Sequence, residues 1–66
     1  MKYLVSATDG QNTSVQQLDA KNPTEAVNKA GYEGSEWDYI TVYQLARVEQ
    51  PVAKFEAVQA IKWEEV

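Results

Sequence analysis

The first predicted element is a strand over residues 2–8, where apolar and polar side chains alternate. Tyr3, Val5 and Ala7 fall on one face of this segment, with the period of two that a half-buried strand requires. Residues 9–12 read Asp-Gly-Gln-Asn, which favours a turn because Asp and Asn tolerate the left-handed backbone region and Gly adopts it at little cost. The pattern therefore predicts a strand that leads into a hairpin.

Two further strands are predicted from the same pattern. A weaker one is expected over residues 13–20, where Val15 and Leu18 are three positions apart, a spacing that breaks strict alternation and indicates a bulge. The strongest one is expected over residues 39–48, which are rich in β-branched and aromatic side chains. Its two faces are expected to carry Ile40, Val42, Ala46 and Val48 on one side and Tyr39, Thr41, Tyr43, Leu45 and Arg47 on the other.

A short helix is predicted between these strands by its capping residues. Asn22 is a favourable N-cap, Pro23 loses no hydrogen bond at the first helical position, and Glu25 can reach back as in a capping box. Gly31 is a natural stop at the other end. A helix of about two turns is too short to be stable alone, so we expect it to pack on the sheet through a stripe of small apolar side chains.

The segment of residues 52–64 fits two interpretations. Phe55, Ala57, Ile61 and Trp63 follow the alternation of a strand, which only Gln59 interrupts. Alanines among Lys, Glu and Gln favour a helix instead, which Pro51 could open. We favour a strand, because the apolar stripe of the alternative helix drifts around the cylinder and holds no single face.

Together these elements predict an α+β fold, a small ββαββ domain in which a single short helix packs on one face of one antiparallel sheet. A right-handed crossover from the second strand through the helix places the third strand beside the first, which gives the strand order 2-1-3-4. Residues 1–66 are expected to form a single domain, because 66 residues leave room for no more. One helix covers only one face of such a sheet, so the other face is expected to be open to solvent or to a partner.

Composition excludes most kinds of chemistry. The chain has no Cys and no His, which excludes disulfides, Cys/His metal sites and mechanisms that need a thiol or an imidazole. The glycines form no phosphate cradle, and the acids lie mainly at turns and helix starts. We therefore expect no catalytic residue, no cofactor and no metal, and do not expect an enzyme. The net charge of −4 and the scattered bases argue against direct nucleic-acid binding.

One stretch stands out by its charge and aromatic content. From Ala30 to Ala46 there is no Lys or Arg, and acids alternate with Tyr and Trp. Trp and Tyr are typical anchors of protein interfaces, and carboxylates steer a basic partner. In the alternative interpretation Trp37 and Tyr39 belong to the core, and Tyr43 makes ordinary cross-strand contacts. The candidate protein-binding residues are Tyr32, Glu33, Glu36, Trp37, Asp38, Tyr39, Tyr43 and Arg47.

A resemblance to a known family rests on residues 18–27, which read Leu18-Asp19-Ala20-Lys21-Asn22-Pro23-Thr24-Glu25-Ala26-Val27. A strand that ends in an apolar-polar-Ala step, followed by a capping residue and Glu-Ala, is similar to the layout of many small phage-encoded proteins. The arrangement through residue 48 resembles the small early podovirus inhibitors of host RNA polymerase, from which residues 52–66 depart. The resemblance implies a compact protein that acts by occupying a surface of a larger machine.

These observations favour a small acidic protein-interaction module, with a phage-type inhibitor or modulator of a host enzyme such as RNA polymerase as the leading form. Its partner is expected to be a larger protein with a basic surface. No apolar run approaches the ~18–20 residues that span a bilayer, so we expect no membrane contact and a cytoplasmic location, in the host cell if the chain is phage-encoded. Two alternatives stay open: a nucleic-acid mimic that blocks a DNA-binding protein, and a self-associating structural protein whose homodimer pairs the fourth strand with its symmetry mate.

Overall fold

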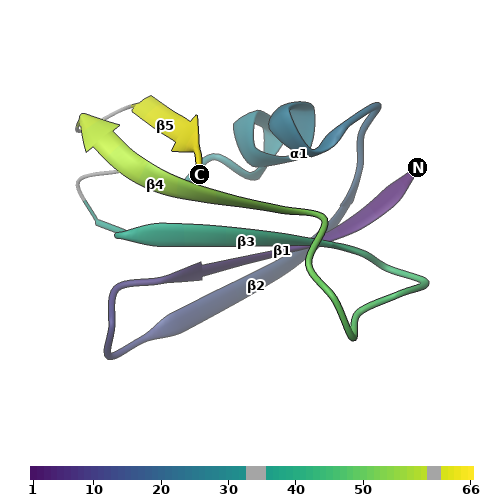
Figure 1. Ribbon diagram of the computed structural model, residues 1–66, viewed down its shortest axis with the longest axis horizontal. Coiled ribbons are helices and arrows are strands. Elements are labelled where there is room, and N and C mark those ends of the chain that lie inside the picture. The colour runs from purple at the N-terminus through teal and green to yellow at the C-terminus, as the bar shows by residue number, and fades with distance from the viewer. Residues whose placement is uncertain (33–35, 60–61) are drawn as a thin grey trace.

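The fold was obtained as a computed structural model, which describes residues 1–32, 36–59 and 62–66. The described residues form five strands and one helix. In chain order these elements are β1 (Lys2–Thr8), β2 (Thr13–Asp19), α1 (Pro23–Ala30), β3 (Tyr39–Gln44), β4 (Ala53–Gln59) and β5 (Lys62–Glu65). All five strands belong to one sheet, and α1 lies on one side of it (Figure 1).

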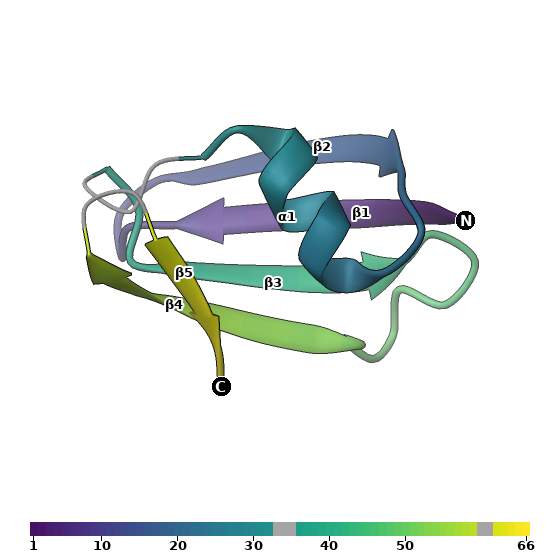
Figure 2. The same ribbon diagram turned by 90° about the horizontal axis from the view of Figure 1, so that it is seen from above.

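The sheet has the strand order β2-β1-β3-β4-β5, and every neighbouring pair is antiparallel. The prediction of a four-stranded ββαββ domain with the order 2-1-3-4 is therefore wrong, because the described chain is ββαβββ. The difference lies at the C-terminal end, where a fifth strand is added outside β4. Seen from above, α1 crosses over β1, near the middle of the sheet (Figure 2).

Residues 52–64 contribute a hairpin, neither the single strand that the alternation favoured nor the alternative helix. Ala57 of β4 pairs with Trp63 of β5, and the register shifts between Ala57 and Gln59. The sequence carries no turn signal here, because residues 52–66 contain no Gly, Pro, Asn or Asp. As a consequence of this hairpin, β4 curls toward the side of α1 and β5 lies at the height of the helix (Figure 1).

β3 is shorter than predicted, because it ends at Gln44 and not at Val48. The pairing of Val42 with Ala53 requires the chain to reverse direction between them. Arg47 N–H donates to the carbonyl oxygen of Gln44 at 2.8 Å and so begins that reversal. The residues that the alternation had assigned to the end of the strand lie in the β3–β4 connection, namely Leu45, Ala46, Arg47 and Val48.

The core lies between the sheet and α1. Alternate residues of the central strands point to this side, and Val5, Ile40 and Val42 are fully buried there. These positions confirm the alternation predicted for residues 2–8 and for the first part of β3. The buried set is Tyr3, Val5, Ala7, Ala20, Ala26, Val27, Ile40, Val42, Ala53 and Phe55.

β2 pairs with β1 without a register shift along its whole length, so the bulge predicted there is wrong. Leu18 lies on the helix side, partly buried against the core. Val15 has the opposite parity along the strand and lies on the other side, where it is 54% exposed. The spacing that suggested a bulge therefore reflects one apolar residue on each face of a regular strand.

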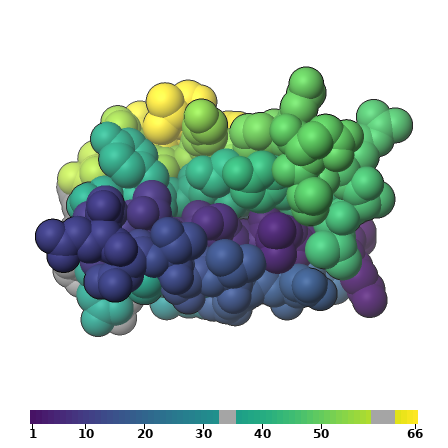
Figure 3. All heavy atoms as spheres, turned by 90° about the horizontal axis from the view of Figure 1, so that it is seen from below, coloured from purple at the N-terminus to yellow at the C-terminus, as the bar shows by residue number. Residues whose placement is uncertain are grey.

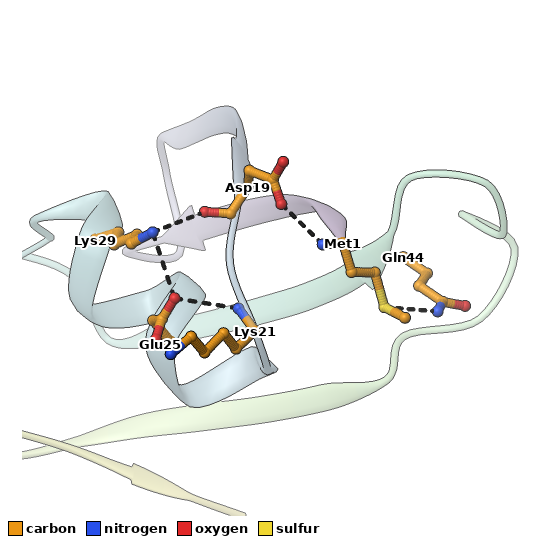
Figure 4. A network of polar contacts seen from close by, with 6 residues as sticks. All are labelled: Met1, Asp19, Lys21, Glu25, Lys29 and Gln44. Atoms are coloured by element: carbon orange, nitrogen blue, oxygen red, sulfur yellow. Dashed lines mark hydrogen bonds and ion pairs between the residues drawn. The ribbon is translucent and has the colours of Figure 1, made fainter.

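The caps of α1 confirm the predicted boundaries. Glu25 N–H donates to Asn22 Oδ1 at 2.8 Å. In the reverse direction, Glu25 Oε1 accepts from Lys21 N–H at 3.1 Å, one residue before the position that a capping box uses (Figure 4). Gly31 ends the helix with φ of 76°, a left-handed conformation that favours glycine.

Polar contacts around Asp19 join α1 to the end of β2. Lys29 Nζ donates to the carbonyl oxygen of Asp19 at 3.2 Å and lies 3.3 Å from Glu25 Oε1 (Figure 4). The amino nitrogen of Met1 lies 2.8 Å from Asp19 Oδ1. Each of these exposed contacts contributes little to stability. We therefore infer that they orient the helix, whereas the buried side chains of α1 hold it on the sheet.

We expect Asn22→Ala to lower the free energy of unfolding by about 1 kcal/mol, because the variant leaves the Glu25 N–H without its acceptor. In a domain of this size this corresponds to a fall in Tm of about 4–8 °C, which thermal unfolding followed by circular dichroism measures. Asn28→Ala is the matched control, since Asn28 is exposed within the same helix and caps nothing. Equal Tm values for the two variants would contradict this role of Asn22.

We expect the stabilising effect of Asp9 to disappear in acid. In the β1–β2 turn its carboxylate accepts from Asn12 N–H at 2.6 Å and Gln11 N–H at 2.9 Å, and these bonds hold the pKa of Asp9 below its usual value of 3.8. Because the pKa is lower in the folded state, the stabilisation is present above the unfolded pKa and is lost as the pH falls through the folded value. Urea unfolding should therefore separate the wild type from Asp9→Ala near neutral pH, and the separation should shrink below pH 3.8. A difference in stability between the wild type and Asp9→Ala that does not change with pH would contradict this role of the Asp9 carboxylate.

Candidate functional site

The side of the sheet opposite α1, which we call the open face, is covered by no element of the described residues (Figure 3). Strand parity places on it the side chains that alternate with the core positions. The open face consists of Lys2, Leu4, Ser6 and Thr8 from β1, Thr13, Val15, Gln17 and Asp19 from β2, Tyr39, Thr41 and Tyr43 from β3, Lys54 and Glu56 from β4, and Glu64 from β5.

Two tyrosines mark the ends of β3 on the open face. Tyr39 pairs with Thr8, and Tyr43 pairs with Leu4, so the rings are four residues or about 13 Å apart along the strand. Tyr39 is 54% exposed, whereas Tyr43 and Leu4, which lie opposite each other on neighbouring strands, are both half-buried. Thr41 lies between the tyrosines on β3, and Lys54 of β4 lies opposite it, so the middle of the open face carries hydroxyl and apolar groups with one basic side chain.

A shallow hollow of about 290 Å³ opens beside Tyr39 on this face. Its size, at the lower end of the about 300–1,000 Å³ typical of ligand pockets, is enough for one or two inserted side chains. The hollow is lined by Thr8, Tyr39, Ile40, Thr41, Lys54 and Val66.

The Tyr39 end of the open face is acidic. Glu56 of β4 lies opposite Tyr39, and Glu64 of β5 lies opposite Glu56. Asp38 precedes Tyr39 and lines with it and Glu56 a second hollow, of about 210 Å³. Lys54, opposite Thr41, is the nearest basic residue along β4. An aromatic ring that protrudes among carboxylates is suited to contact with a basic surface.

Tyr32 and Trp37 lie on the other side of the molecule, packed against the core. Their rings meet edge to face, with centroids 5.6 Å apart and an interplanar angle of 69°. Tyr32 Oη donates to Ser14 Oγ of β2 at 3.1 Å, and the carbonyl oxygen of Tyr32 accepts from Trp63 Nε1 of β5 at 3.1 Å. Tyr32 therefore connects both edge strands, and its ring and that of Trp37 serve the packing of the helix side.

The structure thus divides the predicted binding residues. It places Tyr39 and Tyr43 on the open face, with Asp38 beside Tyr39. Glu36 is exposed before β3, and Arg47 is exposed in the β3–β4 connection. Because Arg47 follows the Gln44 end of β3, it is separated from Tyr39 by the length of that strand. Glu33 lies outside the described residues.

Sequence reasoning placed Thr41 on the same face as Tyr39 and Tyr43, but it left Leu4, Thr8, Thr13 and Val15 out of the candidate site. The signal was present in the alternation of residues 2–8, which sets Leu4 opposite in direction to Tyr3. Val15 was missed because a bulge was assumed in this strand, and a bulge makes it impossible to tell from alternation which face a residue occupies. Glu64 was missed with β5 itself.

Within residues 1–32, 36–59 and 62–66, no group of three or more acidic side chains is arranged to hold a metal ion. No helix in that part of the chain is both long enough and apolar enough to cross a membrane. Comparisons with protein-family models, curated proteins and solved structures found no match. The geometry of the open face is therefore the basis for assigning a function.

Proposed function

We propose that this chain is a small acidic protein-interaction module that docks through the open face onto a basic surface of a larger protein. The observation that supports the proposal is the exposure of Tyr39 and Val15, 54% each, on a face that the described elements leave uncovered. An isolated exposed apolar side chain is ordinary on a protein surface. Here the exposed side chains share one continuous sheet face with Leu4 and Tyr43, which gives a partner a broad area to contact.

The charge distribution indicates the kind of partner. The chain carries a net charge of −4, and three of its carboxylates lie toward the Tyr39 end of the sheet: Asp38 precedes Tyr39, Glu56 lies opposite it, and Glu64 lies opposite Glu56 on the next strand. Aromatic anchors with charged surroundings are typical of interfaces in which the ring supplies affinity and the charges supply orientation and association rate. A basic partner surface complements this arrangement.

Within the proposal, the leading partner is a host enzyme such as bacterial RNA polymerase, bound in the host cytoplasm. The support for this class is the resemblance of residues 18–27, and of the layout through residue 48, to the small early podovirus inhibitors. The module carries out no chemical step in this proposal. It acts by occupying a surface that the larger enzyme needs.

Binding to purified bacterial RNA polymerase tests the proposal. We expect Tyr39→Ala to weaken the complex about 30-fold, the loss typical of an aromatic hot spot. Asn28→Ala is the matched control, because Asn28 is exposed on α1 at the opposite side of the sheet. The association rate should also fall as salt is added, because added ions screen exposed carboxylates.

The possible results of these binding experiments test the docking face and the partner class separately. Equal weakening by the two variants would contradict docking through the open face. No binding to the polymerase would remove this partner class and leave other basic proteins to be tested in the same way. Competition by duplex DNA, together with a steep dependence on salt, would assign the contact to the nucleic-acid mimic instead.

A further inference from the structure

The two edges of the sheet differ in how well they are protected from pairing with another strand. β5 is four residues long, three of them charged, and the adjacent β4 carries a register shift. Shortness, charge and irregularity are the means by which proteins protect an edge strand. β2 is seven residues long, contains no Pro, Lys or Arg, and is regular throughout. Its single charged residue, Asp19, is at its end, so β2 is a long and unprotected edge.

The hairpin reveals which backbone groups of β2 point outward. Ala20 N–H donates to the carbonyl oxygen of Met1 at 3.0 Å, and Asp9 N–H donates to that of Asn12 at 3.2 Å. Bonded and non-bonded pairs alternate along an antiparallel ladder, so the even-numbered residues of β2 bond to β1. The N–H and C=O groups that point away from the sheet are therefore those of Thr13, Val15, Gln17 and Asp19.

We propose that β2 pairs antiparallel with β2 of a second copy of this chain, about a two-fold axis at Gln16. In this register Val15 lies opposite the partner's Gln17, and Thr13 lies opposite the partner's Asp19. Each of the four outward-pointing residues then meets another outward-pointing residue, which gives about eight hydrogen bonds, two for each pair. A symmetric register shifted in either direction leaves one of the four without a partner in β2.

A second copy is the occupant that this strand fits best, because the strand is complementary to itself. The only charge, Asp19, faces a neutral threonine, so no like charges meet across the pair. Isologous two-fold contacts are also the commonest way in which identical chains associate. β4, which sequence reasoning had chosen for such a dimer, is not available, because it lies between β3 and β5.

The two-fold symmetry decides which parts of the two copies become neighbours. The two-fold axis is perpendicular to the sheet, so both α1 helices lie on one side and both open faces on the other. α1 crosses the sheet obliquely, and Gln16 Nε2 of β2 donates to the carbonyl oxygen of Ala30 at 2.9 Å, so the C-terminal end of α1 lies over β2 near the two-fold axis (Figure 2). The C-terminal ends of the two helices therefore become neighbours across the axis. The two open faces become one continuous surface of ten strands, and Val15 of each chain lies near its centre.

Sedimentation and amide hydrogen exchange of the purified chain test the pairing. A single strand pair buries less than the roughly 1,200 Å² of a tight interface, so we expect a dimer with Kd in the micromolar range or weaker. At low concentration the amides of Val15 and Gln17 should exchange rapidly, and that of Gln16, bonded to β1, slowly. At high concentration the exchange of Val15 and Gln17 should slow at least tenfold. A chain that stays monomeric up to about 1 mM, or a dimer in which these amides are not protected, would overturn the proposal.

A pair of variants at one position tests the backbone contact. Val15→Pro removes an outward N–H that β1 does not use, and prolines are tolerated at such edge positions. Because the dimer is two-fold symmetric, the substitution removes one hydrogen bond at each of two equivalent positions. We therefore expect self-association to weaken about 30-fold. Val15→Thr keeps the N–H and the β-branched shape and should retain the dimer. If Val15→Pro fails to fold, as judged by circular dichroism, the concentration dependence of amide hydrogen exchange in the wild type tests the pairing by itself. A folded Val15→Pro that dimerises like the wild type would overturn the proposal.

Discussion

Ile40→Ala is expected to leave the chain largely unfolded at 25 °C. Ile40 is fully buried between the sheet and α1, and truncation of such a residue lowers the free energy of unfolding by about 2–5 kcal/mol. A domain of this size without a disulfide has only about 3–5 kcal/mol to lose. Urea unfolding followed by tryptophan fluorescence and circular dichroism measures the loss.

Tyr39→Ala provides the matched control, because Tyr39 is the neighbour of Ile40 in β3 and points to the opposite face. Its ring is 54% exposed and makes cross-strand contacts with Thr8 and Glu56, so we expect a loss of about 1 kcal/mol or less. The contrast between adjacent positions follows from a sheet with one covered and one open side. Similar losses for the two variants would contradict that arrangement.

Trp63→Ala is expected to lower the free energy of unfolding by about 2 kcal/mol. A fully buried Trp typically contributes about 3–5 kcal/mol, and Trp63 is half-buried against the core. The variant also leaves the carbonyl oxygen of Tyr32 without the indole N–H that lies 3.1 Å away. Because Trp63 pairs with Ala57 across β4 and β5, the loss should include the protection of this hairpin in hydrogen exchange.

Trp63→Phe separates packing from hydrogen bonding at this position. Phenylalanine retains most of the apolar contact and loses only the N–H donor, so we expect a decrease of about 1 kcal/mol. A Trp63→Ala variant as stable as the wild type would show that β5 is not tied to the α1–β3 connection. In that case the helix side of the sheet would be less well closed than the structure indicates.

The parts of the fold that local signals determine were predictable from the sequence. Alternation fixed β1, the Asp-Gly pair located the first hairpin, and Asn22 with Gly31 located the ends of α1. The handedness of the crossover placed β3 beside β1, as in the observed order. β5 was not predictable in this way, because no turn residue separates it from β4 and the tail reads as one continuous alternating segment.

The candidate site was predictable only where it lies on a regular strand. The alternation of β3 correctly separated Tyr39 and Tyr43 from Ile40, because strand parity decides which face each one occupies. Tyr32 and Trp37 lie outside the regular elements, where no period applies. The structure places them against the core beside Trp63 of β5, a strand that the sequence did not reveal.

Site-specific photo-crosslinking shows which face of the sheet a partner contacts. A benzophenone amino acid at Tyr39 samples the open face, and the same group at Asn28 samples the exposed side of α1. With bacterial RNA polymerase, or another basic protein shown to bind, we expect an adduct from Tyr39 and none from Asn28. An adduct from Asn28 alone, or equal yields from both positions, would contradict docking through the open face.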